Sequence, residues 1–381
     1  MDKHKILFIV YHGFAEHSGI SKKIHYQLKG LRENGHEVHV CTYDIAPSGD
    51  RIRYVDGEAL QNFGKGRLAS LRKRMCYNAI VDYVRDNHID VVYARSFHNA
   101  NPFTIRMFRR LKALGVRTAI EIPTYPYDQE YNGFSLSERL QLKVDQLFRH
   151  KLARQTDAIV TFSQDEQIFG QRTIRISNGV DFDSIALWRP TPHATPSEFH
   201  LIGVAEVHYW HGFDRLIHGL GEYYKQPRET TVYFHIVGGI GPSEMYDSKH
   251  APGFHELIER YGLQQYVIFH GTMFGKELDD CFNQCDFAVG SLARHRSGVR
   301  SIKTLKNREY AARGIPFIFS EDDEDFNNRP YIMKVPADES PVDIESILQF
   351  NESLKMDPQA IRDSIRSLSW TTQMQKVIDE L

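Results

Sequence analysis

The sequence has little of what marks several common protein classes. Among its 381 residues there are only 4 cysteines and 3 tryptophans. No apolar run approaches the roughly 18 residues that a membrane span needs. Cys281 and Cys285 lie close together, but no second Cys/His pair stands nearby to complete a zinc site, so free thiols are expected. The N-terminus leads directly into a strand-like run, so we expect no signal peptide.

The net charge of −2 is divided unevenly along the chain. Residues 1–180 carry a net charge of +8 and the remainder carries −10. A basic N-terminal half can face an anionic membrane or an anionic acceptor, although an ordinary solvated surface explains the charge equally well. Because no recognised nucleic-acid-binding motif accompanies it, we expect no nucleic-acid partner.

Apolar runs alternate with helical patterns along almost the whole chain. Lys5–Tyr11 has the composition of a buried strand, and an amphipathic pattern over residues 21–34 follows it. Strands that alternate with helices predict a parallel, doubly wound α/β sheet. The predicted strands are residues 5–11, 37–42, 90–94, 117–122, 158–162, 173–176, 199–205, 231–237, 266–269, 286–289 and 317–319. The further predicted helices are residues 68–87, 102–114, 135–154, 213–224, 254–262 and 276–284.

The pattern stops and starts again near the middle of the chain. Pro190, Pro192 and Pro196 stiffen the intervening segment. Two doubly wound domains in series normally bind a ligand in the cleft between their facing strand ends. The predicted parts are an N-terminal domain of residues 1–180, a linker of residues 181–197, a C-terminal domain of residues 198–365 and a terminal helix of residues 366–381.

Three loops at the predicted strand ends contain residues suited to a phosphate or a nucleotide. Gly19 lets the backbone come close to an anion at a helix N-terminus. His211 can donate to phosphate, and Gly239 lets the backbone pass beneath a flat base or ribose. The alternatives are glycines that only make turns and a histidine that is only a surface residue.

The segment from Lys303 to Ser320 is the most informative part of the sequence. Arg300, Lys303 and Lys306 can neutralise a diphosphate through charge-assisted hydrogen bonds. Glu309 lies on the same helix face as Lys306, and its carboxylate suits the hydroxyls of a ribose. The alternative for Glu309 is an ion pair within the helix, with Lys306 or Lys303.

The predicted N-terminal domain has its own candidate pocket residues. Arg95 ends one strand, and the loop after the next strand contains Tyr125 and Asp128. These three side chains can shape an acceptor pocket, with packing in the core or in the loop as the equal alternative.

Two further segments are interpreted structurally. The acidic run of residues 321–325 is read as a solvated turn, because no further ligand spacing supports a metal. The helix of residues 135–154 has an apolar stripe, which predicts packing against the sheet, with contact to a membrane surface as the alternative. The stripe consists of Leu140, Val144, Leu147 and Phe148.

The order and spacing of several short motifs resemble a known family. The chain resembles the GT-B glycosyltransferases, and among them the large retaining family 4 that assembles bacterial surface polysaccharides. The motifs are Ser18-Gly19, Asn34-Gly-His-Glu-Val38, Ile176-Ser-Asn-Gly-Val-Asp181, Gly212-Phe-Asp-Arg-Leu-Ile217, Ile236-Val-Gly-Gly239, Val267-Ile-Phe-His-Gly271, Glu309-Tyr-Ala-Ala-Arg-Gly-Ile-Pro316 and Ser369-Trp370.

The resemblance implies an activity and a location. A sugar would pass from a nucleotide diphosphate sugar to a glycan or lipid-linked acceptor, with retention, without a metal and without a cofactor. The terminal helix would cross back to the first domain. We expect a cytoplasmic protein that can associate with the inner face of the cell membrane. Glu309 matches the family's second motif glutamate, which binds the donor ribose, and Glu309, Lys306 and Arg95 are the predicted catalytic residues.

The sequence departs from the family at three positions. The first motif glutamate is replaced by Ser301, and the usual Arg and Lys of another loop are replaced by Glu206 and His211. We therefore expect Arg300, Lys303 and Lys306 to supply charge that the other loop lacks. Two alternatives stay open: a nucleotide-sugar epimerase on the same fold, and a catalytically idle GT-B subunit that supports a partner enzyme.

Overall fold

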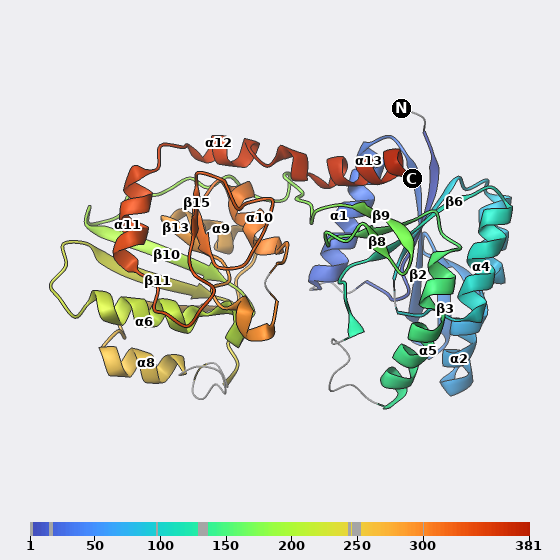
Figure 1. The fold of residues 1–381 in the computed structure, drawn as a ribbon, viewed down its shortest axis with the longest axis horizontal. Coiled ribbons are helices and arrows are strands. Elements are labelled where there is room, and N and C mark those ends of the chain that lie inside the picture. The colour runs from blue at the N-terminus through green and yellow to red at the C-terminus, as the bar shows by residue number, and fades with distance from the viewer. Residues whose placement is uncertain are drawn as a thin grey trace. The chain divides into compact units, whose positions relative to one another are not determined.

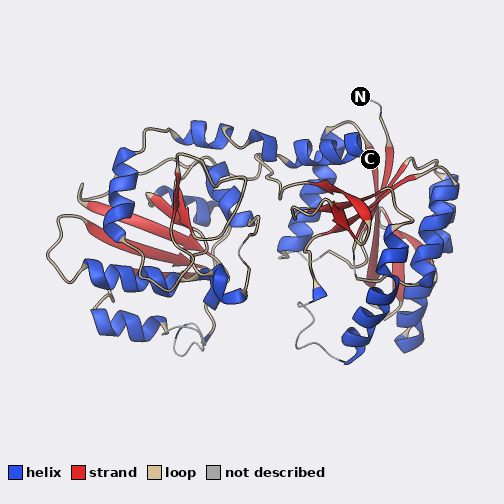
Figure 2. Cartoon of the chain, viewed as in Figure 1, coloured by secondary structure: helices blue, strands red, loops and turns tan. Residues whose placement is uncertain are grey.

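The chain folds into two compact α/β units, drawn in Figure 1. The first consists of Met1–Gly179 with Leu368–Leu381, and the second of Val180–Ser367. The computed structural model describes residues 3–14, 18–96, 98–128, 136–242, 245, 253–299 and 301–381. Each unit is a sheet covered by helices, as Figure 2 shows.

The first unit is built on a nine-stranded sheet with the order β4-β3-β2-β1-β5-β6-β7-β9-β8. The strands from β2 through β1, β5, β6 and β7 to β9 pair in parallel, and β3, β4 and β8 pair antiparallel with their neighbours. The strands are β1 (Lys5–Ile9), β2 (Glu37–Ile45), β3 (Arg51–Val55), β4 (Glu58–Asn62), β5 (Val91–Arg95), β6 (Arg117–Ile122), β7 (Ala158–Thr161), β8 (Gln167–Ile168) and β9 (Gln171–Arg175).

The C-terminal helix α13 (Trp370–Glu380) belongs to the core of this first unit. Trp370 is 2% exposed and packs with Ile24 and Leu28 of α1 (Gly19–Glu33). A Cβ on Gly30 would lie 2.7 Å from the backbone carbonyl of Trp370, so only glycine allows the two helices to come this close. The predicted fold class is confirmed: two doubly wound domains, with the terminal helix packed on the first.

The remaining helices of the first unit differ from the prediction at one place. The single helix predicted over residues 68–87 is two helices, α2 (Gly66–Met75) and α3 (Asn78–Asp86). The chain is extended at Cys76, and the backbone carbonyl of Cys76 accepts a hydrogen bond from Arg53 of β3 (2.8 Å). The strands β3 and β4 were not predicted, so the partner that holds this break was also missed. The other helices are α4 (Pro102–Ala113) and α5 (Leu136–Ala153).

The apolar stripe of α5 does not pack as predicted. Leu140 and Leu147 are 63% and 69% exposed, and Val144 is 37% exposed. Instead Asp145 turns inward, and its carboxylate accepts a hydrogen bond from Tyr127 (2.6 Å). Because a polar residue with a buried partner took the inner face, the apolar stripe faces solvent.

The second unit is built on a six-stranded sheet with the order β12-β11-β10-β13-β14-β15, in which all the pairs are parallel. Its strands are short and almost wholly apolar, as buried parallel strands are. They are β10 (Glu198–Val204), β11 (Thr231–Val237), β12 (Val267–Gly271), β13 (Phe287–Val289), β14 (Phe317–Phe319) and β15 (Ile332–Lys334).

The helices of the second unit include two that the sequence did not predict, α11 (Ile344–Ser353) and α12 (Pro358–Asp363). The segment of residues 181–197 groups with this unit, where Trp188 donates through Nε1 to the carbonyl of Cys285 (3.0 Å). The other helices are α6 (Phe213–Tyr223), α8 (Phe254–Tyr261), α9 (Gly275–Asn283) and α10 (Leu305–Arg313). All four cysteines of the chain are free.

Candidate functional site

The strand order of the second unit marks a place for a ligand. The strand β10 lies between β11 and β13, so the connections that leave β10 and β13 run to opposite sides of the sheet. In doubly wound sheets, ligands bind outside the carboxyl ends of the strands at such a point. Two loops meet here, residues 205–212 and residues 290–299, and the backbone N–H of Leu292 donates to the carbonyl of His211 (2.8 Å).

Lys306 is the central cation of this place. Its Nζ is hidden from solvent and has no hydrogen-bond partner among the described residues. The ammonium lies over the ring of Phe213, 5.6 Å from the ring centroid. Burial, together with the nearby Arg294, lowers the pKa of Lys306 to about 7. A buried ammonium without a partner is costly, so an anion that reached it would be held strongly.

Other buried polar atoms around the start of α10 also lack partners. The Nε of Arg294 and the Oγ1 of Thr304, the N-cap residue of α10, have none among the residues that the structure describes, and neither has the Oγ of Ser291. Arg294 was not singled out from the sequence, because a lone arginine in a loop gives no local signal. Together these atoms offer donors and positive charge to one anionic group.

Glu321 is a carboxylate that acts on both Lys306 and Arg294. It is 1% exposed, and burial raises its pKa to about 7. Its Oε2 has no hydrogen-bond partner in the part of the chain that the structure describes. Lys306 and Glu321 therefore both titrate near neutrality, and neither compensates the other fully.

The prediction of a solvated turn over residues 321–325 is right for Asp322 and Glu324, which are exposed, and wrong for the buried Glu321 and Asp323. Asp323 is completely buried and binds the guanidinium of Arg308, with Nη1 to Oδ2 at 2.7 Å. Asp325 binds the same guanidinium. Arg308 comes from α10 and is 1% exposed, so Asp323 can be buried because a residue distant in the sequence neutralises it, whereas Asp322 and Glu324 are exposed.

His211 lies beside Lys306, as the sequence led us to expect for a ligand-binding loop. Its Nδ1 accepts a hydrogen bond from the backbone N–H of His208 (2.9 Å), which places the proton of the neutral ring on Nε2. Burial and the cations Lys306 and Arg294 lower the pKa of His211 strongly, so the ring stays neutral. It can donate to an anion but adds no charge.

Asp214, in the first turn of α6, forms an ion pair with a residue of the other loop. Both of its carboxylate oxygens accept from Arg296 (2.9 and 2.8 Å), and Arg296 also donates to the carbonyl of Tyr209 (2.9 Å). The residue before α6 is Gly212, which is left-handed, and no side chain caps the helix. This pair joins the two loops of the candidate site.

Glu309 forms an ion pair, but not with the expected partners. Arg313 donates to its Oε1 from Nε (3.1 Å) and from Nη2 (2.9 Å). Its Oε2 takes part in no hydrogen bond with the described residues, and the side chain is 35% exposed. One oxygen is therefore fixed while the other stays available to a ligand. Lys303 pairs with Glu324 at 2.5 Å, and Arg300 lies outside the described residues.

The glycine-rich loop after β11 depends on Gly238 more than on the predicted Gly239. Gly238 has a φ of +127°, and a Cβ there would lie 1.8 Å from the carbonyl oxygen of Ala205. A Cβ on Gly239 would contact nothing. The close packing of this loop against the β10 loop thus requires glycine at position 238.

The residues predicted in the first unit have partners within that unit. Arg95 is buried, and its Nη1 donates to Glu121 at 2.5 Å. Asp128 accepts two hydrogen bonds from Arg149 (2.6 and 3.2 Å), and Tyr125 packs against Phe169. Gly19 is the first residue of α1, after the N-cap Ser18.

A possible cation site lies outside this region. In the described part of the chain, one group of three ligand-type side chains comes together, with the ligand atoms of His193, Glu198 and His200 all within 4.8 Å of one another. No helix among the described residues has the length and apolar character to cross a membrane.

The fold and the site define a class: the chain has the GT-B fold. Three solved structures with 10–15% sequence identity align over almost the whole chain. One is HepE of Anabaena in complex with UDP and glucose, at 15% identity, 99% of this chain, 98% of that chain and a TM-score of 0.55. Another is the catalytic domain of starch synthase IV from Arabidopsis thaliana bound to ADP and acarbose. It has 11% sequence identity, the alignment covers 100% of this chain and 99% of that chain, and the TM-score is 0.59. The third is the pneumococcal O-GlcNAc transferase GtfA in complex with UDP and GlcNAc. It has 10% sequence identity, the alignment covers 99% of this chain and 98% of that chain, and the TM-score is 0.52.

A comparison with protein families finds a match for the N-terminal part of the chain. Residues 18–168 match the family model described as "Glycosyl transferase 4-like domain". The resemblance drawn from the sequence motifs is thereby confirmed for the fold and for this domain. No curated protein is matched in sequence.

Proposed function

We propose that this protein is a retaining glycosyltransferase that moves a hexosyl group from a nucleotide diphosphate sugar to a glycan or lipid-linked acceptor in surface polysaccharide synthesis. The observation that carries the proposal is the buried Nζ of Lys306, which has no hydrogen-bond partner among the described residues and lies at the switch point of a parallel sheet. The matched N-terminal domain and the fold support the same class.

The diphosphate of the donor would lie against Lys306 and Arg294. When the bond to the sugar breaks, negative charge develops on the leaving diphosphate. Cations that are already in place stabilise this charge without reorganising. Because the protein supplies this charge itself, we propose that transfer needs neither a metal nor a cofactor. Departure and attack on one face of the sugar would retain its configuration.

The ribose of the donor would lie against Glu309. Arg313 fixes one carboxylate oxygen, and the other, Oε2, can accept from a ribose hydroxyl. Glu309 thus has a partner that orients it and a free oxygen that can bind, which is the arrangement a positioned acceptor needs.

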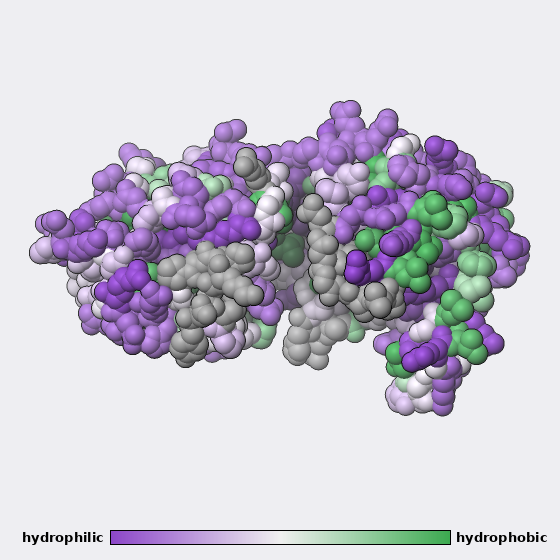
Figure 3. Space-filling model, turned by 60° about the horizontal axis from the view of Figure 1, so that its bottom comes forward, coloured by the Kyte–Doolittle hydropathy of each residue, from purple (hydrophilic) through white to green (hydrophobic). Residues whose placement is uncertain are grey.

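The acceptor would bind the first unit, which also offers a surface for a membrane. The exposed apolar side chains of α2 and α5 stand among exposed basic residues, and the helices are joined by the hydrogen bond from Arg74 to Gln141. Figure 3 shows hydrophobic and hydrophilic surface side by side on this part of the first unit. Such a surface suits an anionic lipid layer, so we propose peripheral attachment at the inner face of the cell membrane. The apolar residues are Leu68, Leu71, Met75, Leu140, Val144 and Leu147, and the basic residues are Arg67, Arg72, Arg139, Lys143 and Lys151.

The experiment that tests the function uses Lys306→Met. Replacing a buried, unpaired charge by an apolar side chain of similar length does not destabilise the fold, so a loss of binding reports the site. We expect nucleoside diphosphates and their sugars to raise the melting temperature of the wild-type protein, and this shift to disappear in the variant. Lys276→Met, at an exposed lysine of α9, is the matched control and should keep the shift.

Product analysis separates the proposed reaction from its alternatives. A transferase releases sugar slowly to water or passes it to an acceptor, whereas an epimerase returns an isomerised donor. Nuclear magnetic resonance of the anomeric proton would show retention. A wild-type protein that no nucleotide diphosphate stabilises, or an epimerised donor, would overturn the proposal.

A further inference from the structure

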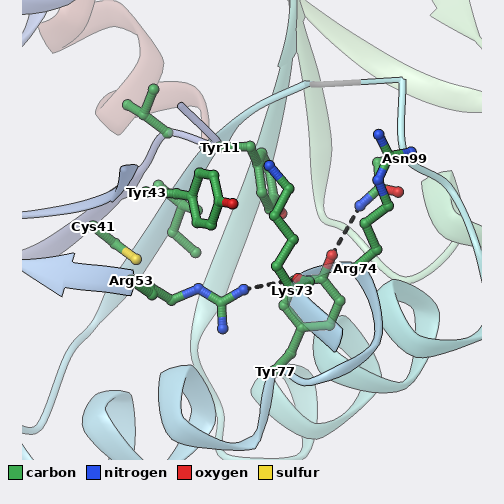
Figure 4. Close-up of a pocket in the computed structure, with 10 residues that line it drawn as sticks. Tyr11, Cys41, Tyr43, Arg53, Lys73, Arg74, Tyr77 and Asn99 are labelled. Carbon is green, nitrogen blue, oxygen red and sulfur yellow. Dashed lines mark hydrogen bonds between the residues drawn. The ribbon is translucent and has the colours of Figure 1, made fainter. Parts of the chain in front are cut away.

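The first unit has a small pocket at the carboxyl end of its own central strands, shown in Figure 4. Tyr11 follows β1 and Asn99 follows β5, the strands between which the order of this sheet changes direction. Arg53 of β3 enters from one side, and Lys73 and Arg74 enter from the last turn of α2. The pocket is therefore at the switch point of the first sheet, where such folds bind ligands.

The charge of this pocket is entirely positive among the described residues that line it. Three of these residues are cations, and none is an aspartate or a glutamate. Burial, with the neighbouring Arg74 and Arg51, lowers the pKa of Lys73 to about 8. The cations thus repel one another, and an anion in the pocket would relieve this repulsion.

Arg53 is the most deeply buried of the three cations that line this pocket. It is 4% exposed, and its guanidinium donates, among the described residues, to neutral oxygens alone: Gln61 Oε1 (2.9 Å), the Cys76 carbonyl (2.8 Å) and the Lys73 carbonyl (3.1 Å). Buried arginines are normally paired with a carboxylate. A buried guanidinium held in place by carbonyl groups, with no carboxylate bound to it, is prepared for an anion that comes from outside.

The walls of the pocket are suited to a ligand with one charged and one uncharged part. The rings of Tyr43 and Tyr77 lie against the cations, with the Nζ of Lys73 3.6 Å from the centroid of Tyr43. The amide of Asn99 donates to the hydroxyl of Tyr77 (2.8 Å). The aromatic rings offer apolar surface to the remainder of the ligand, and the hydroxyls offer hydrogen bonds.

We propose that this pocket binds a phosphoryl group of the acceptor. A phosphate monoester carries close to two negative charges at neutral pH and three acceptor oxygens, which suits a pocket lined by three cations better than the single charge of a carboxylate does. The assignment of this phosphoryl group to the acceptor rests on the proposed function, whereas the phosphoryl site itself rests only on the residues of the first unit.

The test measures phosphate binding directly. Inorganic phosphate is titrated by calorimetry into the full-length Lys306→Met protein, so that the second unit does not compete for the anion. We expect one saturable site, and we expect Lys73→Met to weaken it about tenfold or more, as the loss of a charge-assisted hydrogen bond does. Arg72→Gln, at the exposed neighbouring cation of the same helix, is the matched control and should leave the affinity unchanged. Arg53→Gln should weaken binding similarly, with circular dichroism to check that it folds.

The outcomes are distinct from those of the nucleotide experiment. Absence of phosphate binding, or equal affinity in Lys73→Met and Arg72→Gln, would overturn the pocket while leaving nucleotide binding by the second unit intact. Phosphate binding without any nucleotide effect would leave the pocket standing and refute the proposed function.

A second binding experiment identifies the source of the phosphoryl group. Glucose 1-phosphate in solution represents a soluble sugar phosphate, and phosphatidic acid in phosphatidylcholine vesicles represents a lipid phosphate. Stronger binding of either supports the site and identifies the source. Glucuronate that binds as tightly as glucose 1-phosphate would overturn the phosphoryl assignment in favour of a carboxylate.

Discussion

Single charged residues in the second unit behave according to what surrounds them. Arg308 and Asp323 are both buried and neutralise each other at 2.7 Å, so they stabilise α10 against the segment after β14. Lys306, two residues before Arg308, is buried without such a partner among the described residues. The same helix therefore holds one cation that serves the fold and another that is ready for a ligand.

At Glu309 we predict a loss of ribose recognition. In Glu309→Gln the amide keeps the size of the side chain but removes the charge that accepts the ribose hydroxyl. We expect UDP binding to weaken by about 1.5–3 kcal/mol, roughly tenfold to a hundredfold, and the preference for UDP over its deoxyribose analogue to disappear.

Isothermal titration with the two nucleotides measures this effect at Glu309. Glu277→Gln, at an exposed glutamate of α9, is the control that should bind both nucleotides as the wild type does. A Glu309→Gln protein that still prefers the ribose form would remove Glu309 from the donor site.

At the scale of elements, three strands of the second unit are linked by histidines. Nδ1 of His200 in β10 lies 2.8 Å from Nε2 of His235 in β11, and Nδ1 of His235 lies 2.8 Å from Nε2 of His270 in β12. In each contact one ring nitrogen must donate and the other must accept, so the three rings cannot all carry a second proton while the row is intact. Burial lowers the pKa of all three rings, and that of His235 falls to about 3.

This row of histidines predicts a pH dependence of stability. The usual pKa of histidine, 6.5, applies in the unfolded chain, so the unfolded state takes up the proton first as the pH falls. The contribution of these histidines to the free energy of unfolding is fully present above pH 6.5. It is lost progressively as the pH falls from 6.5 towards about 3. For His235 the decrease is at most about 1.4 kcal/mol per pH unit.

Urea unfolding at pH values between about 4.5 and 8 measures how the free energy of unfolding changes with pH. This range includes the usual pKa of histidine. His235→Asn removes the titrating ring and should flatten the dependence, whereas His255→Asn, at an exposed histidine, should leave it as in the wild type. An unchanged slope in His235→Asn would contradict the account.

The elements also show what the sequence could predict and what it could not. Buried parallel strands are mostly apolar, so their positions were visible in the sequence; β14 was predicted at Phe317–Phe319, where it is found. The stripe on α5 was visible too, but not which face is buried, because Asp145 turns inward to a tyrosine from another loop. The burial of Asp323 likewise depends on Arg308, and no local pattern reveals such a partner.

The candidate site was predictable in the same measure. His211 was chosen because it stands at the exit of a strand, and Lys306 and Glu309 because their charges, on one helix face, suit a diphosphate and a ribose. Arg294 and Glu321 were not chosen, since they converge only through the fold. The partner of Glu309 is Arg313 and not a lysine, because Arg313 lies one turn later on the same face.

At the scale of the whole molecule, the chain begins and ends in the same unit. Trp370 fills the core of the first unit although 188 residues of the second unit separate it from Gly179. A Cβ on Gly179 would lie 2.4 Å from the Trp370 ring, so the packing is close. We expect Trp370→Ala to destabilise the first unit by about 3–5 kcal/mol.

Hydrogen exchange followed by mass spectrometry distinguishes the two units in this variant. Faster exchange should be confined to residues 1–179 and 368–381, and UDP should still protect α10 in the second unit. Equal acceleration in both units would show that they do not fold separately.

The pair of Lys306 and Glu321 has a consequence for the heat of binding. Both groups titrate at about pH 7, so at neutral pH the free protein is only partly protonated there. A diphosphate raises both pKa values, and the protein must take up a fraction of a proton from the buffer as it binds. The measured binding enthalpy should therefore change with the ionisation enthalpy of the buffer, between phosphate-free buffers such as Tris and PIPES.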